Sequence, residues 1–408
     1  MSALLPGDRS RAATLFRTGA FVVLAVTLAL LAATAASGLD GEGRGRLVRY
    51  VGILIAGGLS VAAPHLLFPD PAMRRLQLSN PTPGRLLRRQ LGRWAPVVAV
   101  LAVPAVVIAG AAQPLLAVEG VLSVAALGLF AWVRTATLGL RVRAWERGEK
   151  GRFYRWLTAR FPVFKFQVPD ELVPSFDLTG EIFLAGGALS IAGRAVGDGP
   201  GTLVAPVLLL AVTLALALRQ RGAFDQAFWT SNGVWADAFQ PSEGTGEGRE
   251  PIAYDAVYWA PHAIRARVWA GLVSLDRRLP LGRLVALGLG LVAAVHVADA
   301  GAGPEAASLA LLVLGVNGAV ALTATDELVP GPLALRTGGA WGWAAARFLM
   351  NVRWLPPLAG VLALLAWLTG GLGWAEVWQW ALLDLAVAAL SAGLVTFASH
   401  ARLRRLHA

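Results

Sequence analysis

Five ionisable side chains lie in or next to long apolar runs, where they could carry a proton, an ion or a polar substrate. They are Glu119, Glu181, His296, Asp299 and Asp384. An ionisable group at the centre of a bilayer costs about 2.5–3.5 kcal/mol or more, so such a group usually marks a function. Asp384 stands in the run WQWALLDLAVAAL, with no charged residue four positions away. Asp299 ends its run and is expected among lipid headgroups, so the candidates for a transport path are Asp384, Glu119, Glu181 and His296.

These candidates also have structural interpretations. Glu119 and Glu181 lie close enough to the ends of their runs that their side chains could reach the membrane surface. Asp384 must face the protein interior, and Arg134 is a candidate partner because it is expected at a similar depth. A buried hydrogen bond between helices, with no role in transport, is an equally good explanation of Asp384.

Arginines gather between the second and third apolar runs. The segment 84–94 (GRLLRRQLGRW) places Leu87, Leu91 and Trp94 on one helical face, which predicts an amphipathic helix lying in the membrane interface. Its arginines could anchor the chain on anionic headgroups or dock a soluble partner protein. Residues 340–353 supply a second, less basic version. The docking candidates are Arg85, Arg88, Arg89, Arg93, Arg347 and Arg353.

Several kinds of chemistry have no residues to support them. The chain has no cysteine, its five histidines are scattered, and it contains none of the ATP-binding, zinc-protease or serine-hydrolase motifs. No enzymatic activity, cofactor or metal is expected. The basic and aromatic segment 152–166 could bind single-stranded nucleic acid. Beside apolar runs, an aromatic belt at the membrane surface is the ordinary explanation, so no nucleic-acid partner is expected.

The elements that must position these residues are membrane helices. Of the 408 residues, 56% are hydrophobic and 15% charged, whereas soluble domains have roughly 25% charged residues. About ten runs are long enough to span a bilayer. The sequence therefore predicts an all-α, polytopic integral membrane protein in a bacterial inner membrane. The runs are 18–38, 48–68, 94–112, 114–140, 179–197, 200–218, 281–299, 305–328, 354–371 and 376–397.

The positive charge of the connections predicts the topology. Segments 69–93 and 141–178 and the C-terminal tail are rich in arginine, whereas the connections near 113, 198, 302 and 373 carry almost no basic residue. Both termini should therefore face the cytoplasm. The first run could be a cleaved signal peptide, but its length favours a retained helix.

A pattern recurs about 260 residues apart. RWAP at 93–96 and RWLP at 353–356 each lead into an apolar run, and PDP at 69–71 corresponds to PGP at 330–332. This spacing predicts an internal parallel repeat of a four-helix unit, 18–140 and 281–397. The expected organisation is an N-terminal membrane half (1–218), a cytoplasmic linker (219–262) and a C-terminal membrane half (263–408) that begins with an amphipathic helix at 262–279.

The loops at 67–96 and 328–356 share the form L-(F/V)-P-x-P…R…R-W-x-P. This arrangement resembles the membrane subunits of ABC-2-type exporters. In that family the loop between the second and third helices contacts the ATPase subunit, so the resemblance implies a separate ATP-binding partner. The family's unit has six helices, whereas the second half here is expected to have only four.

Three functions remain open from the sequence. The first is the permease subunit of an ABC-type exporter, in a homo- or hetero-oligomer. The second is an ion-coupled secondary transporter in which Asp384 and Glu119 carry protons or sodium. The third is a scaffold subunit of a larger membrane complex that transports nothing. A copurifying ATPase favours the first, and uptake into liposomes without ATP favours the second.

Overall fold

Every regular element in the described part of the chain is a helix, as the sequence predicts. The computed structural model describes residues 22, 25–26, 28–68, 70, 73–146, 152–160, 173–197, 199–239, 253–278 and 339–352, and single positions between 378 and 396. These residues belong to two compact units, 44–246 and 1–43 with 247–408. Each unit is described by itself.

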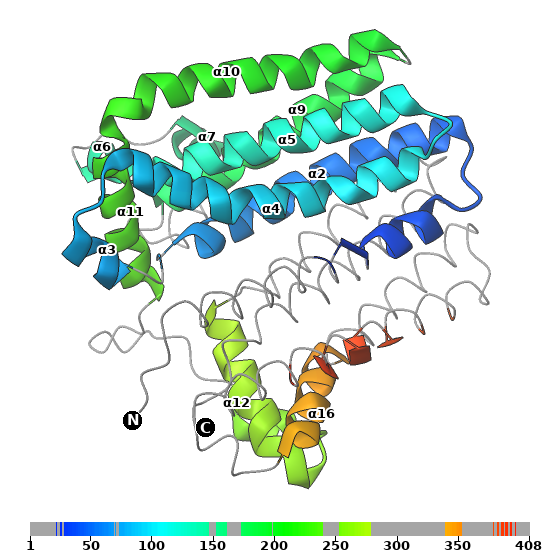
Figure 1. Ribbon diagram of the computed structural model, residues 1–408, viewed down its shortest axis with the longest axis vertical. Coiled ribbons are helices and arrows are strands. Elements are labelled where there is room, and N and C mark those ends of the chain that lie inside the picture. Colours follow the sequence, from blue (N-terminus) through cyan, green and yellow to red (C-terminus); the bar gives the residue numbers. More distant parts are fainter. Residues whose placement is uncertain are drawn as a thin grey trace. The chain divides into compact units, whose positions relative to one another are not determined.

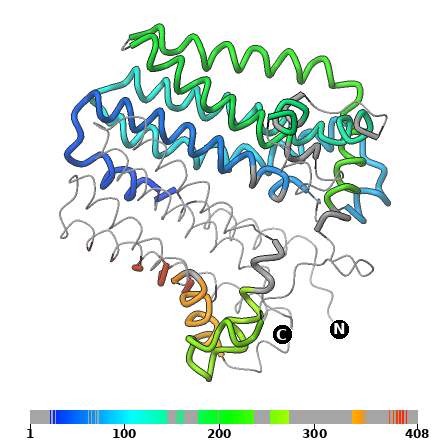
Figure 2. Tube along the Cα trace, turned by 180° about the vertical axis from the view of Figure 1, so that it is seen from behind, coloured from blue at the N-terminus to red at the C-terminus, as the bar shows by residue number. Residues whose placement is uncertain are grey.

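The unit 44–246 is a bundle of antiparallel helices that lie side by side (Figure 1; Figure 2 shows the same unit from behind). Consecutive helices reverse direction, and α5 packs against both α4 and α10. The long helices are α2 (Gly41–Leu67), α4 (Pro83–Ala109), α5 (Pro114–Ala136), α9 (Val173–Val196) and α10 (Val204–Gln220).

Shorter elements connect the long helices. Figure 1 places α3, α6 and α11 at one end of this bundle, which we call the α3 end. The α4–α5 turn, with Gly110 in the left-handed conformation (φ 64°), is at the opposite end. The shorter helices are α3 (Met73–Ser79), α6 (Leu138–Glu146), α7 (Arg152–Arg160) and α11 (Phe224–Phe239), and the 3-10 turns are η2 (Pro200–Leu203) and η3 (Arg221–Ala223).

The predicted linker 219–262 is helical in its first part, because α11 packs against α6. A Cβ atom on Gly139 would lie 2.6 Å from the Ala227 carbonyl oxygen, so only glycine permits this approach. The Gly139 amide donates a hydrogen bond to Ser231 Oγ over 2.8 Å. Phe228 is fully buried. The prediction overlooked this helix because the polar sequence that follows it dominated the composition of the segment.

Three helices of the described residues are long and apolar enough to cross a membrane: Pro83–Ala109, Pro114–Ala136 and Pro200–Trp235. They correspond to the runs predicted at 94–112, 114–140 and 200–218. The most apolar part of the third helix is only 17% buried within the protein. A helix that presents apolar side chains outward in this way fits a lipid environment.

The separate interfacial helix predicted at 84–94 is wrong, because α4 runs without a break from Pro83 to Ala109. Its inward face consists of Leu86, Gln90 and Trp94, all buried at a spacing of four residues. The predicted face contained Leu91, which is 37% exposed. The buried Gln90 concealed the true apolar stripe, since the pattern counted it as polar.

Glycines allow the long helices to approach closely. A Cβ atom would lie 2.6 Å from Ala105 Cβ at Gly120, 2.6 Å from Val98 Cγ2 at Gly128 and 2.3 Å from Ala56 Cβ at Gly186. Small residues at helix contacts are typical of membrane bundles, where association depends on van der Waals packing.

The neighbouring glycines of α9 give a first prediction. Gly186→Ala should destabilise the bundle by about 1–3 kcal/mol, because the new methyl group overpacks the contact with α2. Gly187→Ala is the matched control, since nothing lies within 4 Å of its Cβ position, and it should gain up to about 1 kcal/mol of helix propensity. Thermal unfolding in detergent measures both variants, and equal effects would contradict the packing.

The second unit contains α12 (His262–Arg278), α16 (Gly339–Val352) and the 3-10 turn η4 (Tyr254–Val257). The amphipathic helix predicted at 262–279 is confirmed as α12, with Val268 and Leu272 buried against the rest of the unit. Most of the predicted second repeat lies outside the described residues, including His296, Asp299, Arg353 and Asp384.

Candidate functional site

A buried ion pair joins α2 to α5 inside the first unit. Arg49 Nε donates to Glu119 Oε1 over 3.2 Å, and the two side chains are 11% and 8% exposed. This pairing argues against the structural interpretation in which the Glu119 side chain reaches the membrane surface. Its charge is balanced inside the bundle, where removal of Arg49 would leave the carboxylate uncompensated at a cost of about 3–5 kcal/mol.

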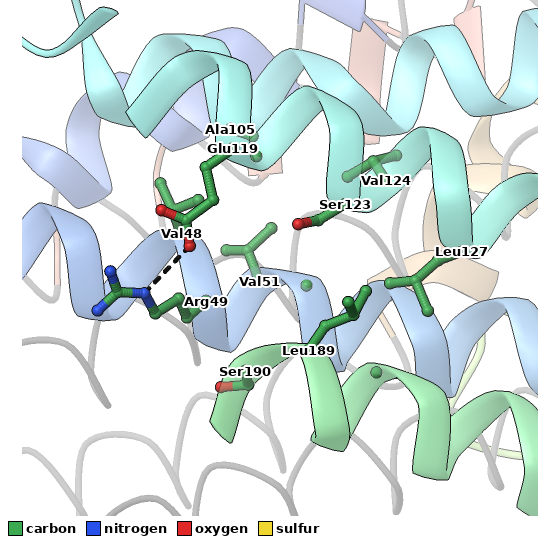
Figure 3. Close-up of a pocket in the computed structure, with 13 residues that line it drawn as sticks. Val48, Arg49, Val51, Ala105, Glu119, Ser123, Val124, Leu127, Leu189 and Ser190 are labelled. Atoms are coloured by element: carbon green, nitrogen blue, oxygen red, sulfur yellow. Dashed lines mark hydrogen bonds and ion pairs between the residues drawn. The ribbon is translucent and has the colours of Figure 1, made fainter. Parts of the chain in front are cut away.

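The ion pair lines a small cavity between α2, α4, α5 and α9. Figure 3 shows Glu119 and Ser123 of α5, Arg49 of α2 and Ser190 of α9 around this space. The cavity leaves about 20 Å³ for the centres of water-sized molecules, whereas one water needs roughly 10–15 Å³. It therefore has room for one or two waters or a monatomic ion and not for a larger substrate.

Unused hydrogen-bonding groups face this cavity. Within the described residues, the hydroxyls of Ser123 and Ser190 make no hydrogen bond, and Glu119 Oε2 has no partner beyond the pair through Oε1. These atoms are not among the fully buried side-chain atoms without a partner, so water that enters the cavity can satisfy them. Gly193 of α9 gives the ion pair room, because a Cβ atom there would lie 3.0 Å from both Arg49 Nε and Glu119 Oε1.

A second cluster lies where α5, α6 and α9 meet. Arg134 and Arg141 both donate to Glu181 Oε2, each over a distance of 2.5 Å. Glu181 is 31% exposed, so this cluster is closer to the surface than the Arg49–Glu119 pair. The structure gives Arg134 a partner other than the predicted Asp384. Two arginines on one carboxylate favour a stabilising role at this helix junction.

Asp70 forms the third cluster, at the α3 end. Its side chain is fully buried and accepts hydrogen bonds from Arg89 Nε and Nη2, each 2.8 Å, and from Arg93 Nη1 at 3.2 Å. The Asp70 amide donates to Asn232 Oδ1 of α11 over 2.8 Å. Arg93 also donates to the Leu66 and Leu67 carbonyl oxygens at the end of α2. Asp70 therefore holds the connection between α2 and α4 in place, against α4 through its side chain and against α11 through its amide.

The fixed connection presents an exposed surface that we call the basic corner. It consists of α3 and the first turns of α4, and no residue of α3 is buried. Leu78 is 86% exposed. Four arginines of the same two helices are also exposed: Arg74, Arg75, Arg85 and Arg88. A surface that combines exposed arginines with an exposed apolar residue is suited to bind another protein.

The structure changes the set of docking residues that the sequence predicts. Arg89 and Arg93 bind Asp70, so they are not free for a partner. Arg347 is 2% exposed and donates to Thr396 Oγ1 over 2.8 Å, which removes it from the exposed surface. Arg85 and Arg88 remain, with Arg74 and Arg75 added by the structure.

The sequence reasoning missed Arg49, Asp70 and the two serines. Asp70 had a visible signal, since it stands between two prolines in the basic loop. Arg49 had none, because it stands at the start of the run predicted at 48–68 and no pattern along the chain pairs it with Glu119. In the described part of the chain, no three His, Asp or Glu side chains gather closely enough to hold a metal ion.

No family model, curated protein or solved structure matches this chain. The function is therefore argued from the clusters above and from the membrane character of the helices.

Proposed function

We propose that this chain is the membrane-spanning permease subunit of an ABC-type exporter and works with a separate ATP-binding subunit. The chain has no nucleotide-binding motif, so a transport cycle driven by ATP requires a partner that hydrolyses it. Such a partner must push on a part of the membrane subunit that is both exposed and firmly connected to the bundle.

The basic corner is the observation that carries this proposal. A loop that only anchors the chain on headgroups needs positive charge and no fixed shape. Here the buried Asp70 ties the loop to α4 through Arg89 and to α11 through Asn232. A force applied to α3 would therefore reach two helices of the bundle.

The exposed Leu78 supports a protein partner over a lipid surface alone. A side chain 86% exposed on the basic corner gives an interface an apolar contact, and arginines are enriched in protein interfaces. The exposed arginines would pair with acidic residues of the partner and accelerate its binding.

Site-specific crosslinking tests this assignment. A photoreactive amino acid at Leu78 should give an adduct with an ATP-binding protein in the native membrane. The same amino acid at Trp156 of α7, which is 55% exposed, is the control and should give none. Adducts with lipid alone at Leu78 would assign the corner to membrane anchoring.

The finer architecture belongs to the same proposal. We expect about ten spans, a parallel repeat of a four-helix unit and both termini in the cytoplasm of a bacterial inner membrane. The α3 end then faces the cytoplasm, where ATP and the partner subunit are found.

The Glu119 cavity favours a second candidate, an ion-coupled transporter. Its carboxylate is buried beside unpaired hydroxyls and a space of atomic size, which suits a proton or a small ion. Transport by the purified chain in liposomes without ATP would favour this candidate over the permease.

A further inference from the structure

We propose that the cluster of Arg134, Arg141 and Glu181 binds the phosphate headgroup of an anionic phospholipid, whose acyl chains lie along the outer face of α9. This binding concerns the isolated chain and does not depend on an ATP-binding partner. The cluster lies at the α3 end of the unit 44–246, where α6 follows α5 and packs against α9 (Figure 1). Basic groups between membrane helices are typical binding sites for lipid headgroups.

The cluster has more positive than negative charge. Arg134 and Arg141 share the single carboxylate of Glu181, so two guanidinium groups and one carboxylate give a net charge of +1. Asp177, one turn earlier on α9, is buried and bonds to neither arginine. The phosphate of a phospholipid such as phosphatidylglycerol carries one negative charge, which neutralises this excess.

The two arginines also have N–H donors that Glu181 does not use. The hydrogen bonds of the cluster all end on Glu181 Oε2, and they come from Arg134 Nε and Nη2 and from Arg141 Nη2. Arg141 Nη1 is buried and has no hydrogen-bond partner, so it lacks the acceptor that buried polar groups nearly always have. A phosphate group supplies several acceptor oxygens, and arginine binds phosphate through two donors at once.

The cluster is accessible at the protein surface. The side chains of Arg134, Arg141 and Glu181 are 17%, 20% and 31% exposed. Because part of the Arg141 side chain reaches the surface, a small turn of its guanidinium brings Nη1 to a phosphate oxygen. The helix α7 packs against α9 and adds two exposed arginines, Arg155 and Arg160, which increase the attraction for an anionic membrane surface.

A stripe of exposed apolar residues continues from the cluster along α9. Leu184, Ala188 and Ile191 lie three, seven and ten positions after Glu181, so the four residues share one helical face. Leu184 is 57% and Ile191 70% exposed. The acyl chains of a lipid held at the cluster would cover this stripe. A free phosphate ion has no apolar part, so the stripe favours a lipid over a soluble anion.

Native mass spectrometry of the purified chain in detergent tests the proposal, with phosphatidylglycerol as the anionic probe and phosphatidylcholine of the same acyl chains as the zwitterionic control. The wild type should bind phosphatidylglycerol at lower concentrations than phosphatidylcholine. Arg141→Gln leaves Arg134 and Glu181 as a neutral pair and should weaken phosphatidylglycerol binding roughly fivefold or more. Arg143→Gln, on the same helix and without a bond to Glu181, is the matched control and should bind as the wild type does.

Two further measurements use the complete set of arginines. Glu181→Gln leaves two guanidinium groups and no carboxylate, a net charge of +2, and should bind phosphatidylglycerol more tightly. Phosphatidylglycerol should raise the melting temperature of the wild type, whereas inorganic phosphate at the same concentration should not.

Four results would overturn the proposal. They are equal binding of the two lipids by the wild type, equal phosphatidylglycerol binding by Arg141→Gln and Arg143→Gln, no tighter binding by Glu181→Gln, and equal stabilisation by inorganic phosphate and phosphatidylglycerol. The last result would assign the cluster to a free anion.

Discussion

Replacing Asp70 by alanine should reduce the free energy of unfolding of the unit 44–246 by about 3–5 kcal/mol. The substitution removes the buried carboxylate that accepts hydrogen bonds from Arg89 and Arg93. The Asp70 side chain is fully buried and that of Arg93 is 17% exposed, so the substitution leaves a largely buried guanidinium without this carboxylate. Chemical unfolding in detergent micelles measures the loss.

The control for this prediction is Asp225→Ala on α11. Asp225 is partly exposed and accepts one hydrogen bond, from Trp229 Nε1 over 3.0 Å, so its loss should cost about 0.5–1.5 kcal/mol. A second test removes Arg89 as well. Asp70→Ala with Arg89→Met removes the two groups joined by the paired hydrogen bonds and should recover part of the stability, while Arg93 keeps its hydrogen bonds to the Leu66 and Leu67 carbonyl oxygens. If Asp70→Ala lowers the free energy of unfolding no more than Asp225→Ala does, Asp70 does not hold the α2–α4 connection in place.

The sequence predicts the helices better than it predicts their side-chain partners. Segments such as 114–136 are recognisable because length and apolar composition are local properties. The partner of Asp70 lies 19 residues away and that of Arg134 lies 47 residues away. Such pairs depend on which helices become neighbours, and no pattern along the chain reports this.

The extent of α4 shows how one residue can mislead a local pattern. The arginines before Trp94 are typical of an interfacial helix, so the segment 84–94 was expected to lie apart from the membrane run. In the structure Gln90 is fully buried on the inner face. The arginine-rich turns and the apolar turns therefore belong to one helix, α4. Through Arg89, this helix holds the basic corner in place.

The cavity was only partly predictable for a similar reason. Glu119 was a candidate because a carboxylate in an apolar run is costly. Arg49, Ser123 and Ser190 come from three different helices, and their convergence follows from the close packing at Gly120 and Gly193. The positions of the glycines in the sequence do not show which side chains come together when the helices pack closely.

The double variant Arg85→Glu with Arg88→Glu should abolish binding of the ATP-binding subunit. It reverses two exposed charges of the basic corner, and like charges facing an interface suppress association by several kcal/mol. Neither residue contacts Asp70, so the fold should be retained. Arg89→Glu is unsuitable for this purpose, because it would place a second carboxylate beside Asp70 and disturb the anchor.

Arg155→Glu with Arg160→Glu provides the matched control, since both arginines are exposed on α7 and the change in net charge is the same. The deciding measurement is the amount of ATP-binding subunit that copurifies with each variant from native membranes, at equal membrane level. If the subunit docks at the basic corner, it should be lost with the α4 variant and copurify with the α7 variant in the same amount as with the wild type. An ATP-binding subunit retained by the α4 variant, or lost equally with both, would contradict docking at this corner.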